Sequence, residues 1–136
     1  MTHWPDDRRI LANVLEVFGS TTYQLQPDFV QALADDPGAR PVIHLTRVGG
    51  PGVSADGVER TRRLKVEVYA AGETAAEDAA EAIHDYLVGH FHYDEANEDL
   101  GLIDTVRTES DPAAVPYPDD VVSLVSATYR TVCRPL

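Results

Sequence analysis

The sequence contains little of what a disulfide-stabilised, membrane-spanning or exported protein needs. Its 136 residues include a single cysteine, Cys133, which excludes an internal disulfide framework and is expected to pack as a small strand residue. No apolar run approaches the roughly 18 residues that span a bilayer. The first seven residues are acidic where a signal peptide is basic and then apolar. We therefore expect a soluble, cytoplasmic protein.

Basic residues are also scarce, with 11 arginines and lysines against 23 acidic residues and a formal net charge of −12. A surface that binds nucleic acid needs a basic stripe, and an acidic protein repels phosphates instead. The length fits one domain, residues 1–136, which can bury roughly two-thirds of its extended-chain surface. The composition thus favours a single acidic globular domain.

Two segments show the spacing of amphipathic helices. The first, Asp6 to Phe18, starts after Pro5 at the expected first helical position, and Gly19 is expected to end it in a left-handed turn. The second runs from Thr74 to Val88, with a capping-box pattern at its start and Gly89 after it. Its predicted buried stripe consists of Ala76, Ala79, Ala80, Ile83, Tyr86 and Leu87.

Four segments have the composition of strands and pair most simply as two antiparallel hairpins. They are Pro41–Val48 with Arg63–Ala70, and Leu102–Asp111 with Val121–Pro135. Their connections, Gly49–Arg60 and Pro112–Asp120, are unusually long, and the first is expected to be mobile because it holds four glycines. The order α-β-β-α-β-β predicts a two-layer α+β fold. Its sheet would be mixed but mainly antiparallel, with at least four strands and two main helices on one face.

Residues 20–40 leave two interpretations open. Pro27-Asp28 could start a short helix that carries Phe29, Val30 and Leu33, and Asp36-Pro37-Gly38 would end it. A connecting strand or irregular segment fits nearly as well.

Alternation assigns the faces of two predicted strands. Leu64, Val66 and Val68 share one face of their strand, and Lys65, Glu67 and Tyr69 share the other. In the last strand Val121, Val125, Ala127 and Tyr129 form one face, and Leu124, Thr128, Arg130 and Val132 form the other. The second face is too polar for a sealed core and too apolar for bulk solvent. We therefore expect it to contact a neighbouring subunit.

The candidates for chemistry are weak. His90, His92 and Asp94, with Glu95 beside them, could bind a divalent metal, but they follow a helix and lack an established ligand spacing. A solvated polar turn is the better interpretation. The acidic pairs Asp6-Asp7, Asp35-Asp36 and Asp119-Asp120 are expected to cap backbone amides, with no carboxyl desolvated for acid–base catalysis. We expect no cofactor, no metal and no enzymatic activity.

One basic cluster stands out in this acidic chain, formed by Arg60, Arg62, Arg63 and Lys65. Charged residues on a strand can simply discourage aggregation at a sheet edge. They could equally form an electrostatic seam against the acidic surface of a second copy.

Taken in order, several segments resemble the tail terminator family of phages with long non-contractile tails. The resemblance covers most of the chain, especially residues 40–135, and no single motif is diagnostic. The segments are Arg40–Gly50, Arg63–Ala70, Thr74–Leu87, Ser110–Pro112, Val115–Asp120, Val125–Arg130 and Arg134-Pro135.

The resemblance implies an α+β subunit that assembles into a ring of six and sits in the tail or neck of the virion. Such a ring ends polymerisation of the tail tube, contacts the tube protein on one face and the head-side connector on the other, and lets DNA pass through its lumen. The family fixes no contact residues. The physical candidates for the interface are Arg47, Gly49, Gly50, Arg60, Arg62, Arg63, Lys65, Tyr117, Asp119, Asp120 and Arg130. Alternatives are a head–tail connector adaptor or stopper, a monomeric regulatory domain and a small metal-dependent enzyme.

Overall fold

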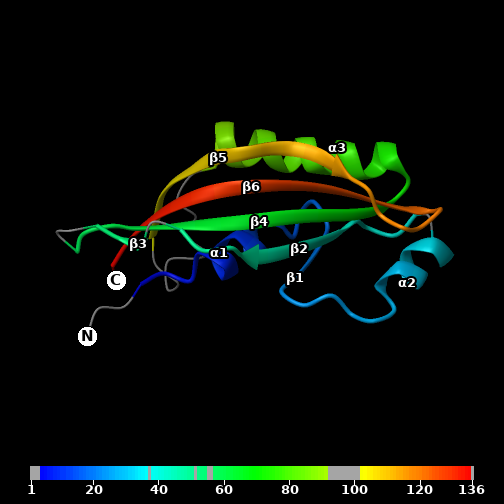
Figure 1. Ribbon diagram of the computed structural model, residues 1–136, viewed down its shortest axis with the longest axis horizontal. Helices are drawn as coiled ribbons and strands as arrows, with labels where there is room; N and C mark the ends of the chain where they lie inside the picture. Colours follow the sequence, from blue (N-terminus) through cyan, green and yellow to red (C-terminus); the bar gives the residue numbers. More distant parts are fainter. Residues whose placement is uncertain (1–3, 37, 51, 55–56, 92–101, 136) are drawn as a thin grey trace.

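A computed structural model describes residues 4–36, 38–50, 52–54, 57–91 and 102–135 of the chain (Figure 1). Its helices are α1 (Asp7–Leu15), α2 (Phe29–Asp35) and α3 (Glu73–Asp85), and α3 continues into a π-helical turn, η1 (Tyr86–His90). Its strands are β1 (Ser20–Thr22), β2 (Val42–Arg47), β3 (Gly52–Val53), β4 (Arg60–Ala71), β5 (Leu102–Val115) and β6 (Val122–Arg134). None of the helices in these ranges is long and apolar enough to cross a membrane.

The strands form one mixed sheet in the order β1-β2-β4-β6-β5, and the short β3 pairs with the start of β4. Only β1 and β2 run parallel, and both predicted hairpins, β2–β4 and β5–β6, are antiparallel pairs. The predicted α+β class and mixed, mainly antiparallel sheet are confirmed. The element order is longer than predicted, because β1, α2 and β3 are additional short elements.

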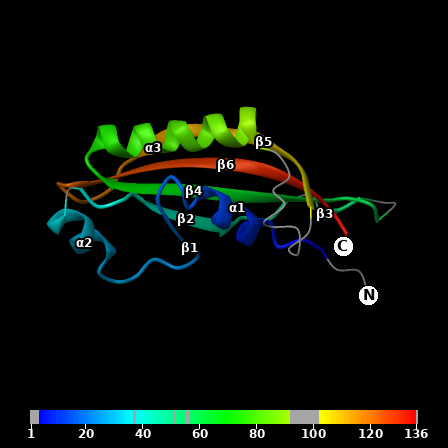
Figure 2. The same ribbon diagram turned by 180° about the vertical axis from the view of Figure 1, so that it is seen from behind.

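The two main helices pack on one face of the sheet, as predicted. Figure 2 shows α1 and α3 on the near side of the strands, whereas Figure 1 views the opposite face. The larger core cluster joins Leu11 and Leu15 of α1 and Ile83 of α3 to one face of the sheet, including Leu64 and Tyr129. The small side chains of the predicted α3 stripe allow this close approach: Ala76 and Ala80 are buried, and Ala79 packs at the margin.

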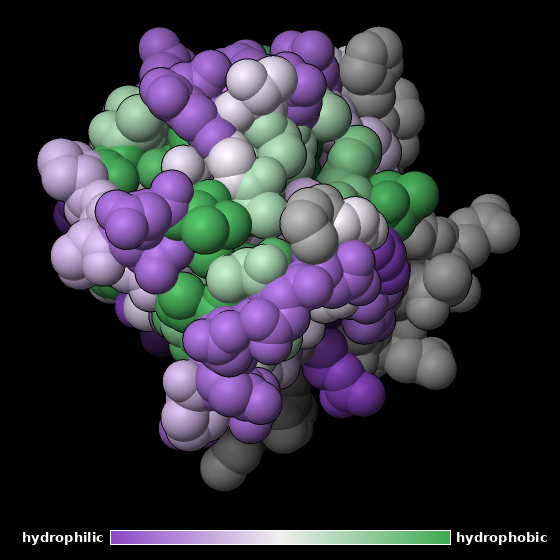
Figure 3. Space-filling view, turned by 90° about the vertical axis from the view of Figure 1, so that its right-hand side faces the viewer, coloured by the Kyte–Doolittle hydropathy of each residue, from purple (hydrophilic) through white to green (hydrophobic). Residues whose placement is uncertain are grey.

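Helix α2 lies on the other face and covers only one end of it. Leu33 of α2 joins Tyr69, Val122 and Leu124 in a second, smaller core cluster. Phe29 meets the Tyr69 ring edge-on, with ring centroids 4.9 Å apart. Figure 3 looks onto this end of the molecule, where apolar side chains reach the surface between polar ones. Residues 20–40 therefore contain both a short strand and the short helix.

Several local predictions about helix ends are wrong. Asp6 is the N-cap of α1 and accepts a hydrogen bond from the Arg9 backbone N–H, so Pro5 lies before the helix. Helix α3 is capped by Gly72, with φ +103°, and the expected capping box at Thr74 is not formed. Gly19 has no left-handed backbone; a Cβ there would lie 2.5 Å from the Pro41 carbonyl oxygen. Close packing of chain segments explains this glycine.

The two predicted long connections differ from what the sequence suggests, one in its length and the other in its structure. Strand β5 continues to Val115, so the link to β6 is residues 116–121. The glycine-rich connection folds back as β3 along the first residues of β4, with Gly52 opposite Thr61 and Val53 opposite Arg60. Backbone pairing therefore orders part of the segment that was expected to be mobile.

Candidate functional site

The face of the sheet opposite α1 and α3 is the candidate functional surface, and we call it the open face. It consists of outward-facing side chains of four adjacent strands, because pairing places alternate residues of β2, β4, β6 and β5 on the same side. Away from the end that α2 covers, its polar residues include His44, Thr46, Arg63, Lys65, Glu67, Arg107, Glu109, Thr128 and Arg130. The predicted polar face of the last strand is part of this surface.

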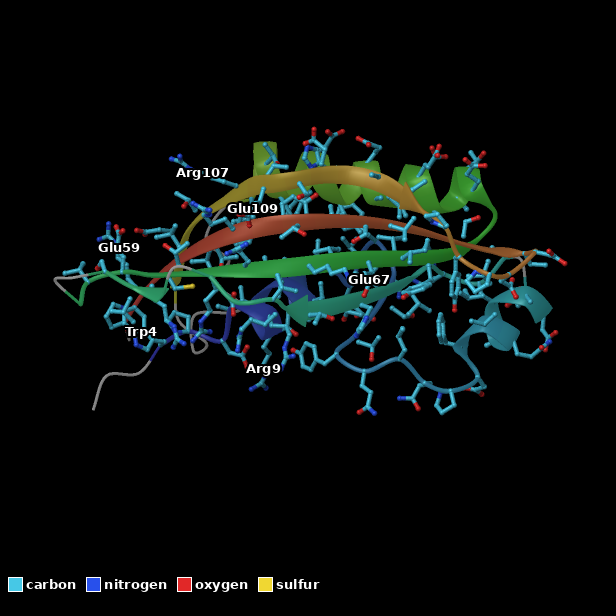
Figure 4. The ribbon with its side chains drawn as sticks, viewed as in Figure 1. Trp4, Arg9, Glu59, Glu67, Arg107 and Glu109 are labelled. Carbon is cyan, nitrogen blue, oxygen red and sulfur yellow. The ribbon has the colours of Figure 1, made fainter. Side chains whose placement is uncertain are left out.

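Two carboxylates organise the charges of the open face. An oxygen of Glu109 lies 3.1 Å from Arg130 Nη2, and its other oxygen lies 3.6 Å from Arg63 Nε. Glu67 lies 3.0 Å from His44 Nδ1 and 3.8 Å from Lys65 Nζ. Figure 4 shows Glu67 on β4 and both Arg107 and Glu109 on β5, with β6 between these two strands. Side chains of β4, β5 and β6 thus form one charged cluster around Glu109, and side chains of β2 and β4 form a second around Glu67.

The basic side chains of the open face are more exposed than its acidic ones. Arg63, Lys65, Arg107 and Arg130 are basic, whereas the side chains of Glu67 and Glu109 are acidic and only 13% and 26% exposed. At the start of β5, Glu59 and Asp104 also line this face, and Asp104 is paired with Arg134. The side chains of Lys65, Arg63 and Arg130 are 40%, 43% and 44% exposed, so their charges remain accessible. Such a surface can bind an acidic partner.

A second charged cluster is buried beneath the other face. The Asp7 side chain is fully buried at the start of α1 and receives Arg47 Nη2 at 2.5 Å and Arg62 Nη1 at 3.1 Å. Its other oxygen accepts a hydrogen bond of 2.9 Å from the Thr131 hydroxyl. Arg62 also donates to the Pro5 carbonyl. This cluster, the Asp7 centre, joins α1 to β2, β4 and β6.

The Asp7 centre corrects one expectation, because the sequence suggested no desolvated carboxyl. Burial opposes ionisation of Asp7, but the hydrogen bond and charge of Arg47 outweigh it, helped by Thr131 and Arg62. The pKa of Asp7 is therefore lowered, which holds the group as a carboxylate. A general acid would need a raised pKa. With both oxygens occupied by protein donors, the centre has the arrangement of a structural ion cluster.

The predicted interface residues separate into three groups. Arg63, Lys65 and Arg130 lie together on the open face, whereas Arg47 and Arg62 point to the helix side and bind Asp7. The pattern of consecutive basic residues could not show this, because alternation places Arg62 and Arg63 on opposite faces. Arg60, opposite Cys133 in β6, belongs to the helix side as well.

The remaining candidates serve turns or the second core cluster. Gly49 has φ +91°, and a Cβ on Gly50 would lie 2.7 Å from the Thr61 carbonyl oxygen. Asp119 accepts from the backbone N–H groups of Val121 and Val122, which lowers its pKa.

Tyr117 packs edge-on against Tyr69, and Asp120 is exposed beside Asp119. Local backbone geometry accounts for the two glycines and for Asp119. Of these five residues, Asp120 is the one whose exposed side chain serves neither a turn nor the second core cluster.

The predicted metal-binding residues fall outside the part of the chain that the structure describes. His92, Asp94 and Glu95 lie outside the described residues, as does the side chain of His90. Within the described ranges, no group of three His, Cys, Asp or Glu side chains could hold a metal ion. His84 of α3, upstream of them, has its Nδ1 atom 2.9 Å from the hydroxyl of the buried Tyr129.

Sequence patterns missed Glu109 and Arg107. Strand β5 contains register shifts between Ile103 and Thr105, between Thr108 and Ser110, and between Ser110 and Ala113. Each irregularity changes the alternation of faces, so period-two assignment fails along this strand.

No protein-family model matches this chain, and no curated protein matches it.

Proposed function

We propose that this chain is a structural subunit that assembles into a ring, the tail terminator of a phage with a long non-contractile tail. The open face is the observation that carries the proposal. It spans four strands and holds partly exposed charges. Among the described residues, α2 covers one end of it and leaves the remainder open. An antiparallel sheet can leave one face in water, but a half-buried face whose most exposed charges are basic, in an acidic protein, suits a subunit contact.

A second feature also supports assembly. Strand β5 has 14 residues and pairs only with β6 within the described chain, so it forms a long edge. Closed rings need two different, complementary patches on each subunit. The open face differs in its exposed charges from the rest of the surface, which is acidic, so each subunit has two unlike patches. An acidic lumen would let DNA pass without adsorption. No cofactor has a role in this function.

The proposal places the protein in the tail or neck of the virion as a ring of six subunits. Light scattering of the purified protein, alone and with tail-tube protein, measures whether it forms a closed oligomer approaching six subunit masses. A sample that remains monomeric under both conditions contradicts the proposal.

A gene deletion separates the terminator from the connector adaptor or stopper. A phage that lacks its terminator should build tail tubes of uncontrolled length, because nothing ends polymerisation. A phage that lacks an adaptor should build tails of normal length that do not join heads. Electron microscopy of the deletion lysate measures tail length directly, with the complemented phage as control.

A further inference from the structure

We propose that the open face binds the outer face of α3 in a second copy of this chain. The inference rests on the proposed ring function and specifies which two surfaces meet. The outer face of α3 carries five exposed acidic residues: Glu73, Glu77, Asp78, Glu81 and Asp85. The helix contains no lysine or arginine. One side of the two-layer domain is therefore acidic, and on the other side, the open face, the most exposed charged side chains are basic.

The placement of these faces gives the contact its geometry. Ala76, Ala80 and Ile83 of α3 are buried against the sheet, so the acidic residues point away from it. Figure 4 shows oxygen-tipped side chains along the outer side of α3, across the domain from α2. Because the two patches lie on opposite layers of one subunit, each copy can use both at once. Such a head-to-tail contact forms a ring if its rotation closes.

The open face also has a place for carboxylates. A shallow hollow of about 330 Å³ lies at its β5–β6 side, lined by Arg107, Arg130, Thr61, Thr105, Val132, Glu59 and Asp104. Of its two carboxylates, Asp104 is already paired with Arg134 Nε at 2.5 Å. Arg107 and Arg130 can each form paired hydrogen bonds with a carboxylate, so these two residues would receive the acidic side chains of α3.

The first test exchanges the charges of the two faces. Lys65→Glu with Arg130→Glu makes the open face acidic, and Glu77→Lys with Glu81→Lys makes α3 basic. Each pair should raise the concentration for half-assembly by more than about tenfold, because like charges then meet across the contact. An equimolar mixture of the two variants should recover association between unlike variants. The acidic open face of one variant then meets the basic α3 of the other, and the basic open face of the second meets the acidic α3 of the first. Analytical ultracentrifugation at about 50 mM salt measures both effects.

Two matched variants control for altered net charge. Arg9→Glu on α1 and Asp35→Lys on α2 each change the net charge as one of the test substitutions does, and these exposed residues belong neither to α3 nor to the strands of the open face. They should assemble like the wild type. If they impair assembly equally, or if wild-type rings tolerate both test pairs, the α3 contact is overturned while the ring function stands. If the wild type never assembles, even with tail-tube protein, both proposals fail.

Cross-linking gives a test that does not depend on electrostatics. A sample of Lys65→Cys mixed with Glu81→Cys should form a dimer with a short bis-maleimide linker, and neither variant alone should do so. The native Cys133 is fully buried and leaves the background low. Absence of the mixed dimer under conditions where rings form would overturn the proposed contact.

Discussion

Arg62 and Arg63 are consecutive residues of β4 and belong to two different charge clusters. The Arg62 side chain is 11% exposed and contacts the fully buried Asp7, whereas the Arg63 side chain is 43% exposed and contacts Glu109 on the open face. The first cluster is closed by protein donors, and the second still presents charge to solvent. The comparison shows that exposure and completeness of pairing, more than residue type, separate a structural cluster from a candidate binding surface.

The largest effect should come from opening the Asp7 centre. Asp7→Ala leaves Arg62 largely buried without its carboxylate and removes the acceptor of Thr131. Breaking a buried ion pair on one side destabilises proteins by about 3–5 kcal/mol. We expect a loss of that size in the free energy of unfolding, measured by urea denaturation.

The matching change on the open face is Glu109→Ala. Both of its partners are more than 40% exposed, so we expect a loss of at most about 1 kcal/mol in the same measurement. Equal losses for the two variants would show that the distinction between the clusters has no energetic basis.

The contribution of the Asp7 centre to stability should depend on pH. The pKa of Asp7 in the folded protein is below its ordinary value of 3.8, so the stabilisation is complete at pH values well above 3.8, where Asp7 is ionised in both the folded and the unfolded chain. It is lost as pH falls below 3.8 through the folded-state pKa. Unfolding free energies between pH 2.5 and 6 should therefore show the wild type approaching Asp7→Asn as the pH drops. A gap that stays constant over this range would contradict the assignment.

The sequence predicted the large features of the fold because they depend on periodicity. The α3 stripe and the alternation of Leu64, Val66 and Val68 specify buried faces, and the structure buries all but the partly covered Ala79 and Tyr86. The Asp7 centre was not predictable in this way. Its three partners lie 40, 55 and 124 residues away, and no local pattern encodes such distant hydrogen bonds.

The open face was predictable in part. Alternation placed Lys65 with Glu67, and Thr128 with Arg130, on polar faces of their strands. It could not place Glu109, because the bulges of β5 shift its register against β6. Nor could it show that the basic cluster is divided between two faces, since this depends on which side of the sheet the helices cover.

An effect on stability smaller than that of Asp7→Ala but larger than that of Glu109→Ala is expected at Gly50, which lies beside β4. A Cβ there would lie 2.7 Å from the Thr61 carbonyl oxygen and 2.8 Å from Arg62 Cα. We expect Gly50→Ala to cost about 1–3 kcal/mol, because backbone atoms must shift to admit the methyl group. Gly89→Ala is the control, since its Cβ would meet nothing within 4 Å. Thermal unfolding should rank the two variants, and similar melting temperatures would contradict this packing.

The smallest effect should be the coupling between Arg63 and Glu109. A double-mutant cycle with Arg63→Ala and Glu109→Ala should give about 0.2–1 kcal/mol, and this energy should decrease as salt is added. The corresponding cycle for Arg62 and Asp7 should give a larger coupling that changes little with salt, because solvent ions do not reach a buried pair. Urea denaturation at about 50 mM and 1 M salt measures the seven proteins of the two cycles, which share the wild type. If salt weakens both couplings equally, Arg62 is as accessible as Arg63, and the division of the basic cluster between two faces fails with it.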